Sequence, residues 1–317
     1  MLAKRISDVP FAELSYASAS DPRLKRWLIR SVEGLSGRDR YAALYDLWRK
    51  NIAPTGDHIF GRMLELVDIG VSKVGQWPPA DLPDTPLVIV ANHPFGIGDG
   101  IAVLSLAEQL GRPFRVMIAS ELLKVRELEP YSLPVDFSDT KAALKNNLAV
   151  RHEAVRLLKA GVTIVVFPAG GVATAPSGFG EARDLPWKVF PARLIQDAKA
   201  SVVPIHFSGQ NGRLFHIVSR PMNLVEHEGR LARMVGKVSL ALRLSLLVRE
   251  FARLSGKTIS VRIGNTLRWQ DLEPLRDRKA LLCELQKTVL DLAPPPVPRR
   301  RRIAVRFGRR SRGINAS

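Results

Sequence analysis

The chain has 317 residues, 46% hydrophobic and 25% charged, which is ordinary for a folded globular protein that can bury a large core. Its charge is not ordinary. Lys and Arg number 48 against 30 Asp and Glu, a formal net charge of +18, which favours polyanionic partners such as nucleic acid, anionic lipid or an acidic protein. The single cysteine, Cys283, excludes a disulfide framework and a cysteine-rich metal site, and its apolar neighbours predict a buried structural thiol.

Targeting segments are not expected. The first residues lack the apolar core of a signal peptide, and no stretch reaches the roughly 18 uncharged apolar residues of a membrane span. The sequence therefore predicts a cytoplasmic protein, with peripheral association at the inner face of the cell membrane left open.

Helical patterns come first along the chain. Asp21-Pro22 is typical of an N-cap followed by a proline in the first turn, and apolar spacings predict further helices over residues 41–48 and 59–69. A proline-rich connector follows at residues 78–86. Residues 1–80 are therefore predicted to be an N-terminal helical region.

Strand and helix patterns alternate beyond the connector, which indicates an α/β sheet with helices on its faces over residues 81–293. A basic tail at residues 294–317, with eight Arg between positions 299 and 312, is predicted to be disordered. The predicted strands are Leu87–Ala91, Phe114–Ala119, Val162–Phe167, Val202–Phe207 and Ile259–Ile263, and the predicted helices lie around residues 100–110, 139–159, 187–199, 237–254 and 276–291.

A histidine and a carboxylate follow the first predicted strand. His93 comes directly after the apolar run, at the carboxyl end where open α/β sheets place their ligand crevices. Pro94, Gly96 and Gly98 force a turn that brings Asp99 back towards the ring. A nearby carboxylate can fix the tautomer of an imidazole and stabilise the imidazolium. The pattern thus predicts an oriented general base.

A structural interpretation fits the same residues. Asp99 precedes an apolar helical pattern, so its carboxylate can act simply as the helix N-cap. His93 can equally be a hydrogen-bonded histidine at a strand end. Other segments must decide between the two.

Two further predicted strands end in small or polar residues. In the block at residues 167–171, the backbone N–H groups of Gly170 and Gly171 are candidates to hold a developing oxyanion. The block at residues 202–211 contains His206, which we expect to be a satisfied histidine rather than a ligand. Three polar strand ends of one sheet would line a crevice.

In this order, the blocks NHPFGIGDG, FPAG and VPIHFSGQN resemble the lysophospholipid acyltransferase (glycerolphosphate acyltransferase-like) superfamily. The chain is most similar to its bacterial hemolysin-like branch, which includes lyso-ornithine-lipid O-acyltransferases, and the likeness covers residues 15–270. The resemblance implies a mixed, mostly parallel sheet flanked by helices, with an N-terminal helical segment. The family's His-x4-Asp pair corresponds to His93 and Asp99, here separated by five residues instead of four.

The resemblance also implies substrate contacts. The family's Phe-Pro-Glu-Gly block corresponds to residues 167–170, where Ala169 replaces the glutamate, which argues against lysophosphatidic acid as the acceptor. Lys124 is a candidate headgroup contact, although a solvated helix face explains it equally well. The expected substrate-binding residues are Asn92, Phe95, Gly96, Phe167, Pro168, Gly170, Gly171 and Lys124.

The implied activity is transfer of a fatty acyl group from a thioester of acyl carrier protein or coenzyme A to a lysolipid hydroxyl in membrane lipid synthesis. No cofactor is expected, the histidines show no metal-ligand spacing, and no Gly-x-Ser-x-Gly motif calls for an acyl-enzyme. Expected partners are the acyl donor, the lysolipid and an anionic membrane surface, but no specific nucleic acid. The alternatives are a catalytically inactive lipid or carrier-protein binder and a basic nucleic-acid-binding protein.

The helix predicted around residues 237–254 bears on membrane contact. Its apolar residues recur every three or four positions and are accompanied by Lys237, Arg243, Arg249 and Arg253. A basic amphipathic helix can lie at an anionic bilayer surface, and core packing is the competing interpretation.

Overall fold

The computed structural model describes residue 34 and residues 38–84, 86–120, 123, 125–136, 140–224 and 242–295. They form a seven-stranded sheet with the order β1-β7-β6-β2-β5-β3-β4. Neighbouring strands are parallel except β6 and β7, which are antiparallel. The predicted mixed, mostly parallel sheet flanked by helices is therefore confirmed. The strands are β1 (Ile69–Val74), β2 (Leu87–Ala91), β3 (Phe114–Ala119), β4 (Ser132–Val135), β5 (Thr163–Val166), β6 (Ser201–Ser208) and β7 (Lys257–Ile263).

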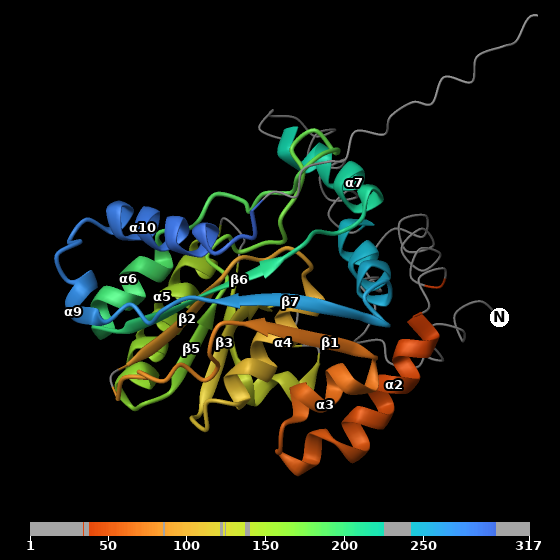
Figure 1. Cartoon of the computed structure of the whole chain (residues 1–317), viewed down its shortest axis with the longest axis horizontal. Helices are drawn as coiled ribbons and strands as arrows, with labels where there is room; N and C mark the ends of the chain where they lie inside the picture. Colours follow the sequence, from red (N-terminus) through yellow and green to blue (C-terminus); the bar gives the residue numbers. More distant parts are fainter. Residues whose placement is uncertain are drawn as a thin grey trace, which may run out of the picture.

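Helices cover both faces of the sheet, with α2, α3 and α4 on one side and α5, α6 and α10 on the other (Figure 1). They are α2 (Arg38–Asn51), α3 (Ile59–Leu66), α4 (Ile97–Glu108), α5 (Lys141–Lys159), α6 (Phe190–Ala198), α7 (Arg213–Leu224), α9 (Trp269–Leu272) and α10 (Arg278–Asp291). Residues 242–252 are helical as well. No helix among the described residues has the length and apolarity needed to cross a bilayer.

The strand β2 shows why the core has two halves. All five of its residues are buried. Leu87 and Ile89 pack in the hydrophobic cluster that contains α2, α3 and α4, whereas Val88 and Val90 pack in the cluster that contains α5, α6 and α10. Because successive side chains of a strand point to opposite faces, a run without polar residues fits a central strand that is covered on both sides.

Two predictions about the first 80 residues are wrong. The helix predicted over residues 59–69 ends at Leu66, and Ile69 begins β1, so the predicted helical region contributes a strand to the sheet. β1 lies at the edge of the sheet, where only its first residue is buried. An edge strand with an exposed face lacks the apolar run that identified the central strands. The helix predicted at Asp21-Pro22 and the tail beyond residue 295 lie outside the described residues.

Cys283 is exposed, contrary to the expected buried thiol. It follows Leu281 and Leu282 on α10, which are both buried, as is Leu285. A helix turns by about 100° per residue, so the position after two inward leucines faces outward. An apolar neighbourhood in sequence therefore does not place this thiol in the core.

The helix at residues 242–252 packs in the core rather than presenting its apolar side to solvent. Leu247 and Phe251 are buried, and Arg243 is only 6% exposed. The Arg243 guanidinium donates to the Val172 carbonyl, and burial lowers the pKa of Arg243 to about 10. For this described part the core-packing interpretation is confirmed, while Lys237 lies outside it.

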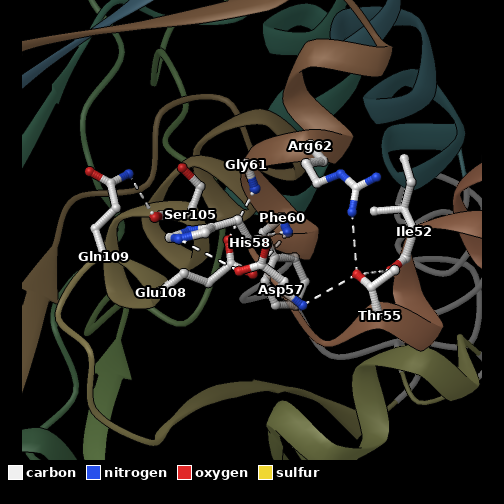
Figure 2. Close-up of polar contacts among 10 residues, drawn as sticks. All are labelled: Ile52, Thr55, Asp57, His58, Phe60, Gly61, Arg62, Ser105, Glu108 and Gln109. Carbon is white, nitrogen blue, oxygen red and sulfur yellow. Dashed lines mark hydrogen bonds and ion pairs between the residues drawn. The ribbon is translucent and has the colours of Figure 1, made fainter.

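A half-buried carboxylate joins α3 to α4 (Figure 2). Glu108, the last residue of α4, accepts hydrogen bonds from the backbone N–H of Phe60 at 3.0 and 3.2 Å and of Gly61 at 3.1 Å. The N-cap residue of α3, His58, supplies no capping side chain. Glu108 thus satisfies N–H groups that would otherwise be unpaired at the start of α3. Burial raises the pKa of Glu108, although these donors oppose the shift.

Candidate active site

Three adjacent strands end at one edge of the sheet. β2 pairs in parallel with both β5 and β6, so their carboxyl ends lie on the same side. His93 follows β2 and Phe167 follows β5, and their rings stack with centroids 4.1 Å apart at an interplanar angle of 28°. The predicted convergence of the strand ends is confirmed. The Phe167 ring therefore covers one face of the imidazole.

Asp99 contacts both the turn that precedes α4 and the histidine. It lies in the first turn of α4, which begins at Ile97 rather than near residue 100. Its Oδ2 accepts the Phe95 N–H at 2.8 Å, while its Oδ1 lies 3.0 Å from Nδ1 of His93. The N-cap interpretation is wrong, because Gly96 is the N-cap residue of α4 and Asp99 lies within the helix, where its second oxygen binds the chain that precedes it.

The pairing of these two side chains is exclusive. Neither Nδ1 of His93 nor Oδ1 of Asp99 has a hydrogen-bond partner elsewhere in the described part of the chain. The Asp99 side chain is fully buried, and that of His93 is 17% exposed. With Nδ1 3.0 Å from the carboxylate, Nε2 is the ring nitrogen on the far side from Asp99. This arrangement suits a neutral imidazole that carries its proton on Nδ1 and keeps a lone pair on Nε2.

A second carboxylate, which the sequence did not reveal, holds the main chain of the histidine. The His93 N–H donates to Oδ1 of Asp184 at 3.2 Å, and Oδ2 of Asp184 accepts from Nε1 of Trp187 at 3.0 Å. The His93 carbonyl accepts the Ala173 N–H at 2.8 Å. Burial raises the pKa of Asp184. The segment of residues 173–184 therefore fixes both backbone polar groups of His93.

The sequence offered only a local signal for Asp184. An aspartate three residues before a tryptophan can accept the indole N–H, as it does here. Its contact with His93 spans 91 positions. Such a long-range contact follows from the folded chain and from no short motif.

Asn92, which was expected to bind substrate, has its carboxamide bonded to the backbone. Its Nδ2 donates to the Phe207 carbonyl at 2.9 Å, and its Oδ1 accepts the Phe207 N–H at 2.7 Å. Both ends of the carboxamide are thus used to join the end of β2 to β6. Phe95 is also buried, with its ring packed over Gly209, where a Cβ would lie 2.5 Å from Cζ of Phe95.

The glycines predicted to contact substrate differ in what they contribute. Gly96 has φ 84°, and a Cβ there would lie 3.0 Å from Leu247 and 3.1 Å from Val172, so it permits close packing. Gly170 donates its N–H to the Phe167 carbonyl at 3.0 Å. The expectation that this N–H holds an oxyanion is therefore wrong, because a turn already uses it.

The other residues of the block after β5 lie mostly inside. Pro168 is buried, and Ala169 is 2% exposed in the same hydrophobic cluster as Val166. Gly171 is half-buried and remains a candidate N–H donor. Lys124 lies outside the described residues.

His206 is buried, and its Nδ1 lies 3.5 Å from the Ser208 hydroxyl. Burial lowers the pKa of His206, and the nearby Arg262 acts in the same direction. Among the described residues, no three His, Cys, Asp or Glu side chains are grouped so as to hold a metal ion.

A family model described as acyltransferase matches residues 78–286. The chain belongs to the acyltransferase family. The range that identifies it as an acyltransferase contains His93, Asp99 and Asp184.

Curated relatives of this acyltransferase include two described as lyso-glycine lipid O-acyltransferase. The protein from Bacteroides thetaiotaomicron is 28% identical over 193 residues, covering 58% of this chain and 61% of the relative. The protein from Phocaeicola vulgatus is 26% identical over 190 residues, covering 58% and 60%. The chain thus spans about three fifths of the length of these relatives. The crystal structure of the 1-acyl-sn-glycerophosphate acyltransferase PlsC from Thermotoga maritima aligns with a TM-score of 0.43 and 16% identity, over 81% of this chain and 82% of that chain.

Proposed function

We propose that this acyltransferase moves a fatty acyl group from a thioester to the hydroxyl of a lysolipid, with His93 as general base. The observation that carries the proposal is the 3.0 Å contact between Nδ1 of His93 and the fully buried carboxylate of Asp99. Thioesters are already activated, because a thiolate with a pKa near about 8.5 is a good leaving group. The demanding step is to make an alcohol nucleophilic at neutral pH.

The reaction proceeds in two proton transfers. Nε2 of His93 takes the hydroxyl proton while the oxygen bonds to the thioester carbon, which gives a tetrahedral oxyanion. The carbonyl then re-forms as the carbon–sulfur bond breaks, and the thiolate takes the proton back from His93. The products are the acylated lipid and a free thiol, and the enzyme forms no covalent intermediate.

Asp99 stabilises the imidazolium formed in the first step. Its Oδ1 lies 3.0 Å from Nδ1, and because the carboxylate is fully buried and the histidine side chain only 17% exposed, water screens the two charges only in part. A positioned general base contributes about 10²–10⁴-fold to the rate, and orientation and stabilisation of the oxyanion must supply the remainder. We assign one oxyanion contact to the Gly171 N–H.

Asp184 acts as a positioning residue in this proposal. It holds the His93 N–H, and Phe167 stacks on the imidazole ring. Together with Asp99 these contacts restrain the histidine at its main chain, at its ring face and at Nδ1. A base fixed in this way loses little entropy when the acceptor hydroxyl arrives.

The acceptor we propose to test first is lyso-glycine lipid, the lipid in the description of both relatives. We further propose that the acyltransferase works in membrane lipid synthesis as a peripheral protein at the inner face of the cell membrane. For the donor, the net charge of +18 favours acyl carrier protein, which is typically acidic, over coenzyme A.

The test is a donor and acceptor matrix with purified protein in detergent micelles. Palmitoyl thioesters of acyl carrier protein and of coenzyme A are each combined with lyso-glycine lipid, lyso-ornithine lipid and lysophosphatidic acid, and products are identified by mass spectrometry. We expect transfer to an amino-acid lysolipid that disappears with His93→Gln. Folded protein that acylates none of the three acceptors would contradict the proposal.

A further inference from the structure

Three large apolar side chains are exposed on neighbouring segments. Phe179 is 58% exposed, Leu214 is 44% exposed and Ile217 is 42% exposed. Leu214 and Ile217 lie three residues apart on α7, and therefore on the same side of that helix. We call these three side chains the apolar tip. In Figure 1 the green segment that includes Phe179 extends beside α7, away from the helices that cover the sheet.

Direct contacts hold the apolar tip together. A Cβ on Gly178 would lie 3.4 Å from Cα of Ile217, so the two backbones are in close contact. The side chain of Gln210 accepts the Ala182 N–H at 2.8 Å and donates to the Gly180 carbonyl at 3.0 Å. The chain around Phe179 is therefore held on one side by α7 and on the other by Gln210, which precedes α7.

The segment that carries Phe179 is also the one that holds the catalytic candidate. Thr174 and Arg183 exchange two backbone hydrogen bonds at 2.9 and 3.0 Å, which close residues 174–183 into a hairpin. Immediately outside this pair, Ala173 and Asp184 bind the two backbone groups of His93. The apolar tip therefore projects from a hairpin whose base positions the histidine.

Basic side chains lie on or beside the segments that carry the apolar tip. Arg183 at the base of the hairpin and Arg213 at the start of α7 are exposed, and neither forms an ion pair with another described residue. Arg253 is 50% exposed and lies against Gly212, where a Cβ would be 2.1 Å from Nη1 of the arginine. The same Nη1 lies 3.5 Å from Oε2 of Glu250, with which it forms an ion pair. The exposed acid nearby is Glu181. The rim therefore carries net positive charge.

We propose that the apolar tip and its basic rim are the surface with which this acyltransferase docks on an anionic lipid bilayer. Apolar side chains entering the acyl region and arginines at the headgroups are the combination that interfacial proteins use. The inference rests on the proposed function, because the acceptor lysolipid resides in a bilayer. Docking at the tip brings the base of the hairpin, and with it His93, towards that bilayer.

A bilayer fits this surface better than a protein partner does. A fully buried aromatic side chain covers about 150–250 Å², so three half-exposed apolar side chains offer no more than about 400 Å². A stable protein interface buries about 800 Å² on each partner. Shallow insertion into lipid requires no complementary surface, so a small apolar tip is sufficient.

The test is sedimentation of the full chain with vesicles of phosphatidylcholine alone or mixed equally with phosphatidylglycerol. Phe179→Ser combined with Ile217→Ser should lower partitioning onto the anionic vesicles by about tenfold or more. The matched control is Leu144→Ser combined with Leu148→Ser, which removes two exposed apolar side chains from α5. The control should partition like the unmodified protein. Circular dichroism and thermal melting verify that both variants are folded.

A charge variant gives a second readout. Arg213→Gln should weaken binding to the anionic vesicles and leave binding to phosphatidylcholine unchanged, because only the anionic surface attracts the arginine. Unchanged partitioning of a folded tip variant would overturn the proposal. So would loss of a dimer in the tip variant by analytical ultracentrifugation, since that result would assign the surface to a second copy of the chain.

The docking proposal and the proposed function can be tested independently of each other. The tip variant should acylate a lysolipid dispersed in detergent at the rate of the unmodified protein, and lose activity only on lysolipid within vesicles. Vesicle binding that depends on the tip, without transfer to any acceptor, would support docking and contradict the proposed function. If the tip variant transfers acyl groups to lysolipid in vesicles at the normal rate, the proposed function is supported and docking at the tip is contradicted.

Discussion

Replacing Asp99 with asparagine separates the two tasks of that side chain. An asparagine can still accept the Phe95 N–H with its carbonyl oxygen, as Oδ2 does at 2.8 Å. Its amide N–H2 then faces Nδ1 of His93, where the carboxylate oxygen lies at 3.0 Å. An amide donor at that place favours the tautomer with the proton on Nε2, which cannot accept a hydroxyl proton, and it removes the charge that stabilises the imidazolium.

The expected loss follows from the geometry. Opposite unit charges about 4 Å apart attract each other by about 4 kcal/mol at an effective dielectric constant of about 20. Each 1.36 kcal/mol corresponds to about a tenfold change in rate, so kcat should fall by about 10³-fold. The analogous Asp→Asn change in a serine protease triad costs about 10⁴-fold. Stability should fall by only about 1 kcal/mol, because the hydrogen bond to Phe95 persists in a weaker form.

The assay compares kcat, KM and urea unfolding of the Asp99→Asn variant with those of the unmodified acyltransferase. We expect kcat to fall steeply while KM for the lysolipid stays within about threefold. Asp99→Ala is the companion variant, since it also leaves the Phe95 N–H unpaired and should cost a further 1–3 kcal/mol or so of stability. A folded Asp99→Asn variant with near-normal kcat would refute the reasoning.

Three further predictions concern other contacts. Asp184→Asn should lower kcat with little change in KM, because it loosens the main chain of His93, and equal loss of activity and folding would contradict a positioning role. Glu108→Gln tests the raised pKa of that carboxyl, whose ionised form costs stability above its folded pKa. Relative to this variant, the unmodified protein should gain stability as the pH falls from about 7 towards about 4.5, and a constant difference in urea unfolding would contradict the shift. Gly209→Ala should destabilise by about 1–3 kcal/mol, since φ is 124° and the new Cβ meets the ring of Phe95, and unchanged thermal melting would contradict that packing.

The centre of the sheet was predictable because β2 is buried on both faces. β2 and β3 begin and end at the predicted residues, β2 as a continuous apolar run and β3 as an apolar run interrupted only by Arg115. β4 and α7 were not predicted. β4 has four residues including Pro134, and α7 begins directly after a glycine-containing loop with Arg213. Neither segment has a run of buried apolar residues, at strand or helix spacing, that is long enough to be recognised in the sequence.

The candidate site was predictable in part for the same physical reason. Residues at the carboxyl ends of parallel strands must meet, so the proximity of His93 to Phe167 follows from strand positions alone. The sequence cannot show whether a polar group turns towards the site or towards the backbone. Asn92 and the Gly170 N–H both turn inward, where each satisfies a neighbouring backbone group. Asp184 was missed because its partner is far away along the chain.

The central claim is that His93 removes the proton from the acceptor hydroxyl. Single-turnover transfer by His93→Gln tests it most directly, because glutamine preserves bulk and a donor for the buried Asp99 yet cannot act as a base. The account predicts a rate of acyl transfer about 10²–10⁴-fold below that of the unmodified enzyme, with an unchanged melting temperature. Transfer at the normal rate by this variant would contradict it.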